Sequence, residues 1–390
     1  MSTTKQHRLA ILTNMVAPAR IPMFSGLAGH FNLMVLHGGI EANRDTWSDA
    51  SRDIPNARVV KAWGWQIRSA RRENGQIFDS LYTHVAPGYL WHLLRFHPEA
   101  IITGEMGSRT LIALAYGALF RTPVWVWWGG TCHTERSRGP AKGLLRRLIS
   151  RWVQHWISYG ETSTEYLLTL GIRRGRILQI QNAVDEAAFL SPVEPQFPFK
   201  VRPVVLHVGQ LIARKGIEHL LKAAAILQRE GHQFSLLLVG NGREKTALEK
   251  LVEDLGLQDV YFQPALPPHK MPSVYRSADI LVFPTLEDVW GLVANEAVLS
   301  GMTVLCSKYA GCAKELFPRQ NIFDPLNSDE FTAKLRDALT HRLPKPDPAR
   351  LLSTRQIVET LIDGIESSLD HRSQGPAHQG TTGGLTAAKY

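Results

Sequence analysis

Cysteines, long apolar runs and an apolar leader are scarce or missing in this chain of 390 residues, and each absence removes a class of protein. Its three cysteines, Cys132, Cys306 and Cys312, lack the spacing of a disulfide framework or a metal site, so structural thiols in a reduced, cytoplasmic protein are expected. No run approaches the roughly 20 apolar residues of a membrane-spanning helix, and residues 1–8 lack the apolar core of a signal peptide. With 44% hydrophobic and 20% charged residues, the composition predicts an ordinary globular protein.

Acidic residues are scarce in one half of the chain. Residues 1–190 hold 22 Lys and Arg against 13 Asp and Glu, whereas residues 191–390 hold 22 of each, so the whole net charge of +9 lies before residue 191. No motif for reading DNA or RNA accompanies the basic half, so no nucleic-acid partner is expected. An anionic membrane surface, bound peripherally on its cytoplasmic face, or a phosphate-bearing acceptor explains the asymmetry more economically.

The positive charge is densest between residues 135 and 151. Arg136 and Arg138 lie in a Gly- and Pro-containing loop, and both are candidate contacts for an anionic acceptor or a lipid headgroup. A predicted helix follows with one basic and one apolar face. Core packing of the apolar face is favoured about two to one, because a β/α domain needs covering helices, and a membrane interface is the alternative. The apolar residues are Leu144, Leu145, Leu148, Ile149, Trp152, Val153 and Trp156.

Strand-like runs alternate with helical patterns along the chain, which predicts an α/β fold with parallel sheets covered on both faces. The length exceeds what one core usually holds, so two domains are expected, at residues 1–190 and 191–345. A C-terminal helix at 346–370 follows, for which packing back on the first domain is an open alternative, and then a disordered tail at 371–390. Residues 41–80 are polar and poorly patterned, which predicts loops and insertions near an acceptor cleft.

Two carboxylates eight residues apart, Asp288 and Glu296, mark the most informative segment. An apolar run at 280–284 precedes them, and a turn containing Trp290 and Gly291 opens a helix, so backbone N–H groups and the positive helix end face a crevice. Such a site suits a ligand with both hydroxyls and phosphate, such as a nucleotide-sugar. For an isolated pair, a loop Asp and a solvated helix Glu are the alternative.

A second motif lies upstream, where the buried strand-like run 204–208 ends at Gly209 and Arg214-Lys215 precede the next helix. Adjacent Arg and Lys can hold a diphosphate, Arg through its planar fork and Lys as a point charge. Alone, such a pair is usually a solvated turn. Its occurrence beside the carboxylate pair, in successive β/α units, favours a nucleotide-sugar site.

These two motifs, together with Asn182-Ala183-Val184-Asp185 and Phe189, resemble the signature of retaining GT-B glycosyltransferases of family 4 over about residues 155–325. The resemblance implies two Rossmann-like domains that face a central cleft. It implies transfer of a hexose-type sugar, with retention, from a UDP- or GDP-linked donor to a glycan or lipid-linked acceptor. Cell-surface polysaccharide or glycolipid biosynthesis is the expected setting. The nucleotide-sugar is a substrate, and neither a cofactor nor a metal is expected.

The resemblance also assigns roles in the C-terminal domain. Arg214 and Lys215 match the diphosphate-binding pair, and Glu296 matches the carboxylate that accepts hydrogen bonds from the ribose hydroxyls. Asp288 stands where the family most often has Glu against the donor sugar, whereas Glu287 is one residue out of register. Further donor contacts are expected from Gly209, Gly240, Trp290, Gly291 and Leu292.

Three candidates lie in the N-terminal domain, after predicted strands whose carboxyl ends would border the cleft. His133 resembles the family's histidine near the donor sugar, with a structural histidine as an equal alternative. Arg20 stands where relatives carry a Gly-Gly loop near the phosphates, and Glu105 ends another strand. Two other functions stay open: a sugar-nucleotide epimerase on the GT-B frame, and a non-catalytic nucleotide-sugar-binding protein.

Overall fold

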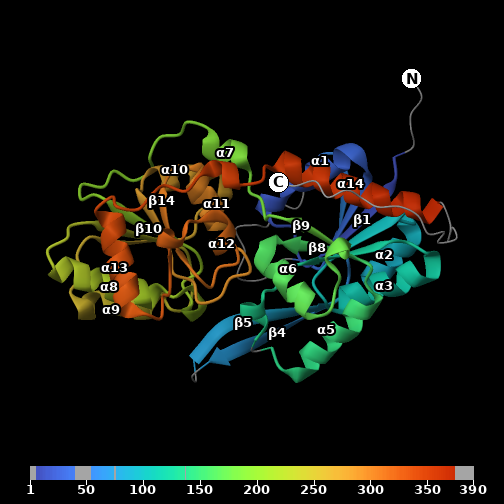
Figure 1. Cartoon of the computed structure of the whole chain (residues 1–390), viewed down its shortest axis with the longest axis horizontal. Coiled ribbons are helices and arrows are strands. Elements are labelled where there is room, and N and C mark those ends of the chain that lie inside the picture. Colours follow the sequence, from blue (N-terminus) through green and yellow to red (C-terminus); the bar gives the residue numbers. More distant parts are fainter. Residues whose placement is uncertain (1–5, 40–53, 74–75, 137, 374–390) are drawn as a thin grey trace, which may run out of the picture.

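The computed structural model describes residues 6–39, 54–73, 76–136 and 138–373. They form two β/α lobes that lie side by side (Figure 1). The connection between the lobes runs from residue 181 to residue 203 and includes the short helix α7 (Glu186–Leu190). The predicted disordered tail lies outside the described residues from position 374 onward.

The N-terminal lobe is built on a seven-stranded parallel sheet in the order β3-β2-β1-β6-β7-β8-β9. Its strands are β1 (Arg8–Thr13), β2 (Asn32–His37), β3 (Ala57–Lys61), β6 (Ala100–Gly104), β7 (Val124–Trp128), β8 (His155–Tyr159) and β9 (Ile177–Ile180). The central strands are largely apolar and buried, as both-side coverage of a parallel sheet requires. The covering helices are α1 (Ile21–His30), α2 (Gly88–Phe96), α3 (Ser108–Phe120), α4 (Cys132–Glu135), α5 (Pro140–Trp152) and α6 (Gly160–Thr169).

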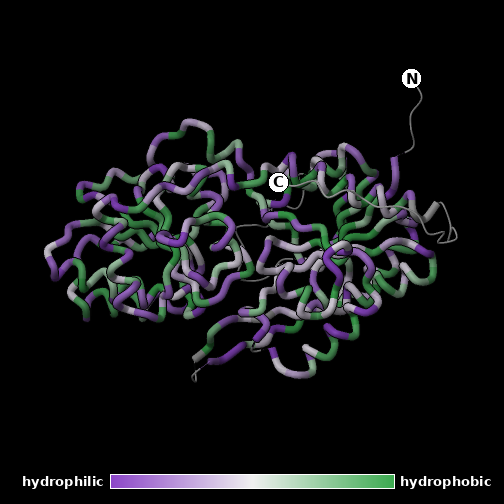
Figure 2. The backbone as a smooth tube through the Cα atoms, in the orientation of Figure 1, coloured by the Kyte–Doolittle hydropathy of each residue, from purple (hydrophilic) through white to green (hydrophobic). Residues whose placement is uncertain are grey.

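The C-terminal lobe repeats this plan on a six-stranded parallel sheet in the order β12-β11-β10-β13-β14-β15. Hydrophobic chain segments gather on the strands inside both lobes (Figure 2). The two parallel sheets confirm the predicted α/β class. The strands are β10 (Val204–Val208), β11 (Ser235–Val239), β12 (Val260–Gln263), β13 (Ile280–Phe283), β14 (Thr303–Ser307) and β15 (Ile322–Phe323), and the helices are α8 (Ile217–Arg229), α9 (Lys245–Leu255), α10 (Met271–Arg276), α11 (Leu292–Leu299), α12 (Ala313–Leu316) and α13 (Ser328–Leu339).

The last helix, α14 (Thr354–Ser373), follows the C-terminal lobe but packs on the N-terminal one beside α1 (Figure 1). The indole Nε1–H of Trp125 on β7 donates to Ser368 Oγ at 3.2 Å. A Cβ on Gly26 of α1 would press against Val358, so the two helices approach closely there. The chain therefore crosses between the lobes twice.

The structure corrects the prediction of loops over the described part of residues 41–80. Besides β3, it contains an antiparallel hairpin of β4 (Trp65–Glu73) and β5 (Gln76–Val85), paired from Trp65↔Val85 to Glu73↔Gln76. The hairpin extends from the N-terminal lobe toward the C-terminal one (Figure 1). Most of β4 is exposed, so it lacks the apolar alternation by which strands are recognised in a sequence. Residues 40–53 lie outside the description.

Helix α5 supplies a second correction. Core packing of its apolar face is the favoured prediction, but Leu144, Leu145, Leu148 and Trp152 are exposed, with Leu144 at 71% and Trp152 at 60%. The helix ends at Trp152, and Trp156, expected on the same helix, is fully buried in strand β8. No helix in the described part of the chain is both long and apolar enough to cross a membrane.

Candidate active site

The Arg214-Lys215 pair lies in one turn of 3-10 helix, η5 (Ala213–Lys215), between strand β10 and helix α8. Gly216 follows with φ +65°, in the left-handed region, and a Cβ there would collide with the carbonyl oxygen of Pro284. Only glycine fits both conditions without strain. This close approach places the basic pair beside the loop that leaves strand β13.

Both cations contact the loop that leaves strand β13. Lys215 Nζ lies 2.6 Å from Asp288 Oδ2, and Arg214 Nη1 donates to the backbone oxygen of Glu287 at 2.8 Å. Burial opposes the ionisation of Asp288, but the charges of Lys215 and Arg214 outweigh it and hold the pKa of this carboxyl below its usual value. Asp288 is therefore ionised at neutral pH, and the structure brings three predicted site residues into one ion-pair cluster.

The turn after Asp288 packs against buried side chains of its own lobe. Gly291 has φ +105°, and a Cβ there would collide with the ring of Phe283. Trp290 is fully buried, and its indole N–H donates to Asn295 Oδ1 at 2.9 Å. The ring of Trp290 therefore supports the turn from the interior rather than lining an open surface. Leu292 begins helix α11 directly after the turn.

Glu296 lies on the second turn of α11 and accepts a 2.5 Å hydrogen bond from the hydroxyl of Tyr275 on α10. Burial raises the pKa of Glu296 to about 7, against which the hydrogen bond from Tyr275 acts. Gly209 and Gly240 end strands β10 and β11, and a Cβ on Gly240 would collide with the carbonyl of Gly209. The two strand ends therefore meet through bare backbone, next to the basic pair.

His133 reaches the same loop from the other lobe. Its Nε2 lies 2.9 Å from the carbonyl oxygen of Leu286, and its ring stacks on Tyr309 with centroids 4.3 Å apart. Burial lowers the pKa of His133, with Arg136 adding to the effect, so a neutral imidazole donates through Nε2–H. Arg136 in turn donates to the carbonyl of His133 at 2.8 Å.

Arg20 and Glu105 have no hydrogen bond or ion pair to the Arg214 cluster in the described structure. Arg20 donates to the hydroxyl of Tyr159 at 2.7 Å and lies over the ring of Trp127. Glu105 is 68% exposed and pairs with Arg109 at 3.4 Å. Glu105 directly follows strand β6, whereas Arg20 ends a 3-10 turn between β1 and α1, and the partners of both are residues of their own lobe.

Three further residues complete the cluster: Arg138, which the sequence offered as a candidate, and Arg71 and Asp79, which sequence reasoning did not select. Arg71 on β4 donates bidentately to Glu287 at 2.9 and 2.7 Å, and Arg138 lies 3.3 Å from the same carboxylate. Asp79 on β5 lies 3.0 Å from Arg214 Nε. The Asn74-Gly75 dipeptide between two strand-length runs was the available signal for a hairpin. No sequence signal indicated that the hairpin contacts the other lobe.

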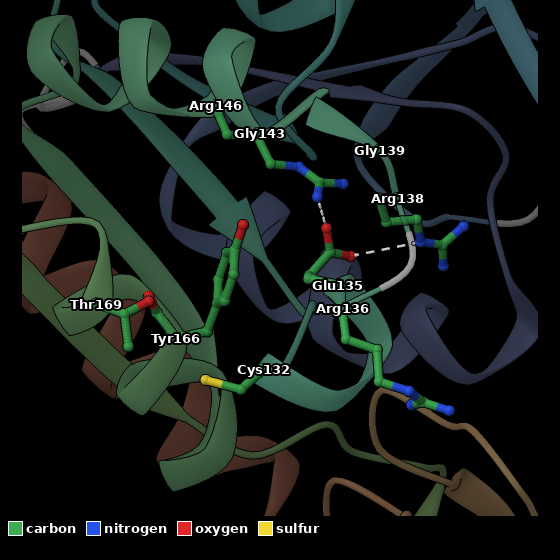
Figure 3. A pocket seen from close by; sticks show the side chains of 9 residues that line it. All are labelled: Cys132, Glu135, Arg136, Arg138, Gly139, Gly143, Arg146, Tyr166 and Thr169. Atoms are coloured by element: carbon green, nitrogen blue, oxygen red, sulfur yellow. Dashed lines mark hydrogen bonds and ion pairs between the residues drawn. The ribbon is translucent and has the colours of Figure 1, made fainter. Parts of the chain in front are cut away.

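A pocket of about 250 Å³ adjoins the cluster between the start of α5 and helix α6 (Figure 3). Arg146 and Arg138 point toward Glu135 from two sides, whereas Arg136 points away from it (Figure 3). Arg138 belongs to both the pocket and the cluster, because it also bonds to Glu287. The remaining lining residues are Cys132, Gly139, Gly143, Tyr166 and Thr169.

The C-terminal lobe is similar in sequence to known proteins. Residues 194–351 match the family described as glycosyl transferases group 1. The matched segment contains all six strands of the C-terminal sheet. Two curated relatives agree. The 2-deoxystreptamine glucosyltransferase of Streptomyces kanamyceticus is 32% identical over 240 residues, 58% of this chain and 58% of that protein. The D-inositol 3-phosphate glycosyltransferase of Nocardia farcinica is 33% identical over 163 residues, 40% of this chain and 36% of that protein. The alignments thus span less than two thirds of either relative.

Solved structures match over nearly the whole chain and show the GT-B fold that the sequence predicts. HepE of Anabaena in complex with UDP has a TM-score of 0.65 at 16% identity and covers 94% of this chain and 98% of its own. The lipopolysaccharide outer core galactosyltransferase WaaB has a TM-score of 0.65 at 13% identity and covers 92% of this chain and 99% of its own.

Within the ion-pair cluster, the neighbouring carboxylates Glu287 and Asp288 contact different partners. Glu287 is 3% exposed and turns to Arg71 and Arg138 of the N-terminal lobe. Asp288 turns to Lys215 of its own lobe. Among the described residues, no group of three or more His, Cys, Asp or Glu side chains is arranged to hold a metal ion.

Proposed function

We propose that this protein is a retaining glycosyltransferase that moves a hexose-type sugar from a UDP- or GDP-linked donor to a hydroxyl of a glycan or lipid-linked acceptor. The observation that carries the proposal is the ion-pair cluster of Arg214, Lys215 and Asp288 at the carboxyl ends of β10 and β13. Ligands in open α/β sheets bind at such strand ends. Glu296, on the helix that follows, supplies a carboxylate for the ribose.

The chemistry would be divided among these residues. Arg214 and Lys215 stabilise the charge that develops on the departing diphosphate, the largest electrostatic change in the reaction. Asp288 and the neutral His133 orient the sugar. The acceptor oxygen bonds to the anomeric carbon on the face from which the diphosphate leaves, and the acceptor proton passes to a phosphate oxygen. Closure of the cleft excludes water and limits hydrolysis.

The acceptor belongs to the N-terminal lobe in this proposal. The pocket beside Arg138 adjoins the loop that carries Asp288, where the donor sugar would lie. Its guanidinium groups suit an anionic acceptor. Helix α5 forms one wall and presents exposed Leu144, Leu148 and Trp152 beside exposed Lys142 and Arg147. An amphipathic basic helix of this kind suits peripheral binding to an anionic bilayer, which would present a lipid-linked acceptor to the pocket.

A panel of nucleotide-sugars tests the proposal. A donor that binds the folded protein raises its melting temperature according to its concentration and affinity. We expect one UDP- or GDP-sugar to raise the melting temperature more than the same sugar 1-phosphate does, since the Arg214-Lys215 pair would bind a diphosphate. The selected donor should then be consumed faster when an acceptor extract is added, with a product that retains the anomeric configuration. Failure of every nucleotide-sugar and of free UDP and GDP to bind would contradict the proposal.

A further inference from the structure

Tyr275 is a fully buried side chain of α10 whose only polar atom contacts the proposed ribose carboxylate. Its hydroxyl donates to Glu296 Oε2 at 2.5 Å, at the short end of the range for such bonds. A neutral donor paired with a carboxylate leaves the second carboxylate oxygen, Oε1, to accept from a ligand. The contact therefore fixes one oxygen of Glu296 and orients the other.

The phenol ring is itself held in place. Phe189 of the interlobe helix α7 meets the Tyr275 ring edge-on, with centroids 5.6 Å apart and an interplanar angle of 79°. Next to Glu296, Asn295 donates to the carbonyl of Asn182 at 2.8 Å. Helix α11 is thus attached to the interlobe connection directly through Asn295, and its neighbouring Glu296 is attached indirectly through Tyr275 of α10. The Tyr275 side chain, held by these contacts, keeps one rotamer, which a preorganised binding group requires.

We propose that Tyr275 is a positioning residue for the donor ribose and acts through Glu296, holding that carboxylate in the orientation that the ribose hydroxyls need. The inference rests on the proposed function and deepens it by naming a residue outside the family signature. Tyr275 would not touch the donor. Its hydroxyl also favours the ionised form of Glu296, whose pKa burial raises to about 7, so the effect depends on pH.

Other charged groups on the neighbouring elements have their own partners. Arg276 of α10 donates to the carbonyl oxygens of Ser300 and Phe189, at 3.3 and 3.4 Å. On α7, Glu186 accepts from the backbone N–H of Thr354. Toward strands β10 and β13, Lys215 pairs with Asp288. On β14, the buried Cys306 contacts the backbone of Ser307. Tyr275 therefore has the direct hydrogen bond to Glu296, while these groups are directed elsewhere.

The sign of the pH effect follows from these contacts. The ionised carboxylate is the better hydrogen-bond acceptor, so UDP or GDP should bind more tightly as the pH rises through about 7, the pKa of Glu296. Removing the hydroxyl in Tyr275→Phe removes an interaction that favours the ion, so the transition moves to higher pH. If the pKa of Glu296 rises by about one, the ionised fraction at a given pH falls by up to about tenfold.

The experiment combines two measurements on the full chain. Carbon-13 NMR of labelled glutamate follows the titration of Glu296 without ligand, with Glu296→Gln assigning the signal. Calorimetry then measures UDP and GDP affinity from mildly acidic to mildly alkaline pH. For Tyr275→Phe we expect a raised Glu296 pKa and nucleotide binding about three- to tenfold weaker near neutral pH, with a smaller deficit at alkaline pH. Tyr261→Phe, which alters an exposed tyrosine in the same lobe, is the matched control.

The outcomes separate the inference from the function on which it rests. A nucleotide lacking both ribose hydroxyls, 2′,3′-dideoxy-UDP, should bind the parent protein and Tyr275→Phe equally. A weakening of UDP that is the same at every pH, or an unchanged Glu296 titration, would overturn the positioning role while leaving donor binding intact. If the folded parent protein binds neither UDP nor GDP, the proposed function itself fails, and this inference with it.

Discussion

The two lobes share a β/α plan but present opposite surfaces. Of the twenty-one large hydrophobic side chains exposed among the described residues, sixteen lie before residue 191, and so does the whole net positive charge of the chain. Residues 191–390 hold equal numbers of acidic and basic residues, and the C-terminal lobe buries almost all its large apolar side chains in the described structure. Apolar and basic groups together suit an amphiphilic, anionic partner, whereas a closed, neutral surface suits a small ligand held at one defined site.

The lobes also build their site residues differently. In the C-terminal lobe, Arg214, Lys215 and Asp288 come from two loops at the ends of adjacent strands, so short-range geometry brings them together. In the N-terminal lobe, Arg71 and Arg138 reach the same loop from a hairpin and from an interhelix segment. The residues of the C-terminal lobe therefore meet because they follow adjacent strands of one sheet, whereas the contacts from the N-terminal lobe depend on how the two lobes meet.

The largest effect should come from the Arg214-Lys215 pair of the C-terminal lobe. Lys215→Ala removes a preorganised charge from the departing diphosphate, and losing one such contact typically lowers turnover about a hundredfold to a thousandfold. Sugar transfer from the donor found in the panel measures it. Lys222→Ala is the matched control, because Lys222 is exposed on α8 and pairs along its own helix with Glu218. Parental turnover by a folded Lys215→Ala protein would refute the diphosphate role.

The surface contrast predicts the next effect. Each basic residue near an anionic bilayer contributes about 1 kcal/mol, so replacing Lys142, Arg147 and Arg151 by Ser should weaken vesicle binding up to about a hundredfold at low salt. Co-sedimentation with anionic vesicles measures this, and binding of the parent protein should fall as salt rises. Arg138 is left unchanged because it bonds to Glu287.

A control with the same change of charge lies on the other lobe. Lys222, Lys245 and Lys250 are exposed on α8 and α9, and replacing them by Ser should leave vesicle binding unchanged. Equal losses for the two triple variants would mean that net charge alone acts, with no membrane-facing side. Equal binding of the parent protein to neutral vesicles would contradict the electrostatic part of the proposal.

The carboxylates of the donor lobe should each contribute about tenfold to ligand affinity, the usual result of removing one charged hydrogen-bond partner. Glu296→Gln keeps the size of the side chain and should weaken nucleotide-sugar and free nucleoside diphosphate alike, because both carry the ribose. Asp288→Asn should weaken the intact donor more than the free diphosphate, because its proposed partner is the sugar. Calorimetry with both ligands compares them. Parallel losses with Asp288→Asn would remove it from the sugar site.

The sequence predicted the strands and loops of the C-terminal lobe better than the N-terminal residues that contact them, for a physical reason. Strands β10 and β13 are almost wholly buried, so they read as apolar runs, and the residues at their ends lie in one place whatever the rest of the fold does. The hairpin is different. Its strand β4 is exposed for most of its length, and the bidentate partner of Arg71, Glu287, lies 216 residues away in the chain.

Helix α5 shows the limit of periodicity. Its apolar stripe was visible, but a stripe does not say whether protein or something else covers it. The structure leaves Leu144, Leu148 and Trp152 exposed, whereas Ile149, one residue away from Leu148, is fully buried. Likewise Glu287 was set aside because it is out of register with the motif, and its role as the partner of two arginines from the other lobe depends on contacts that no local pattern encodes.

The smallest expected effect concerns the ion pair between Asp79 of the N-terminal lobe and Arg214 of the C-terminal lobe. Asp79 of the hairpin lies 3.0 Å from Arg214 Nε, so its carboxylate competes with a diphosphate for the same guanidinium. Ion pairs that are partly open to solvent contribute about 0.2 to 1 kcal/mol, so Asp79→Asn should tighten UDP or GDP binding by about 1.4- to fivefold. Calorimetry measures the change, with Asp254→Asn, an exposed carboxylate on α9, as the control. Weaker binding would mean instead that Asp79 orients Arg214 for the donor, and the hairpin would then belong to the donor site rather than compete with its ligand.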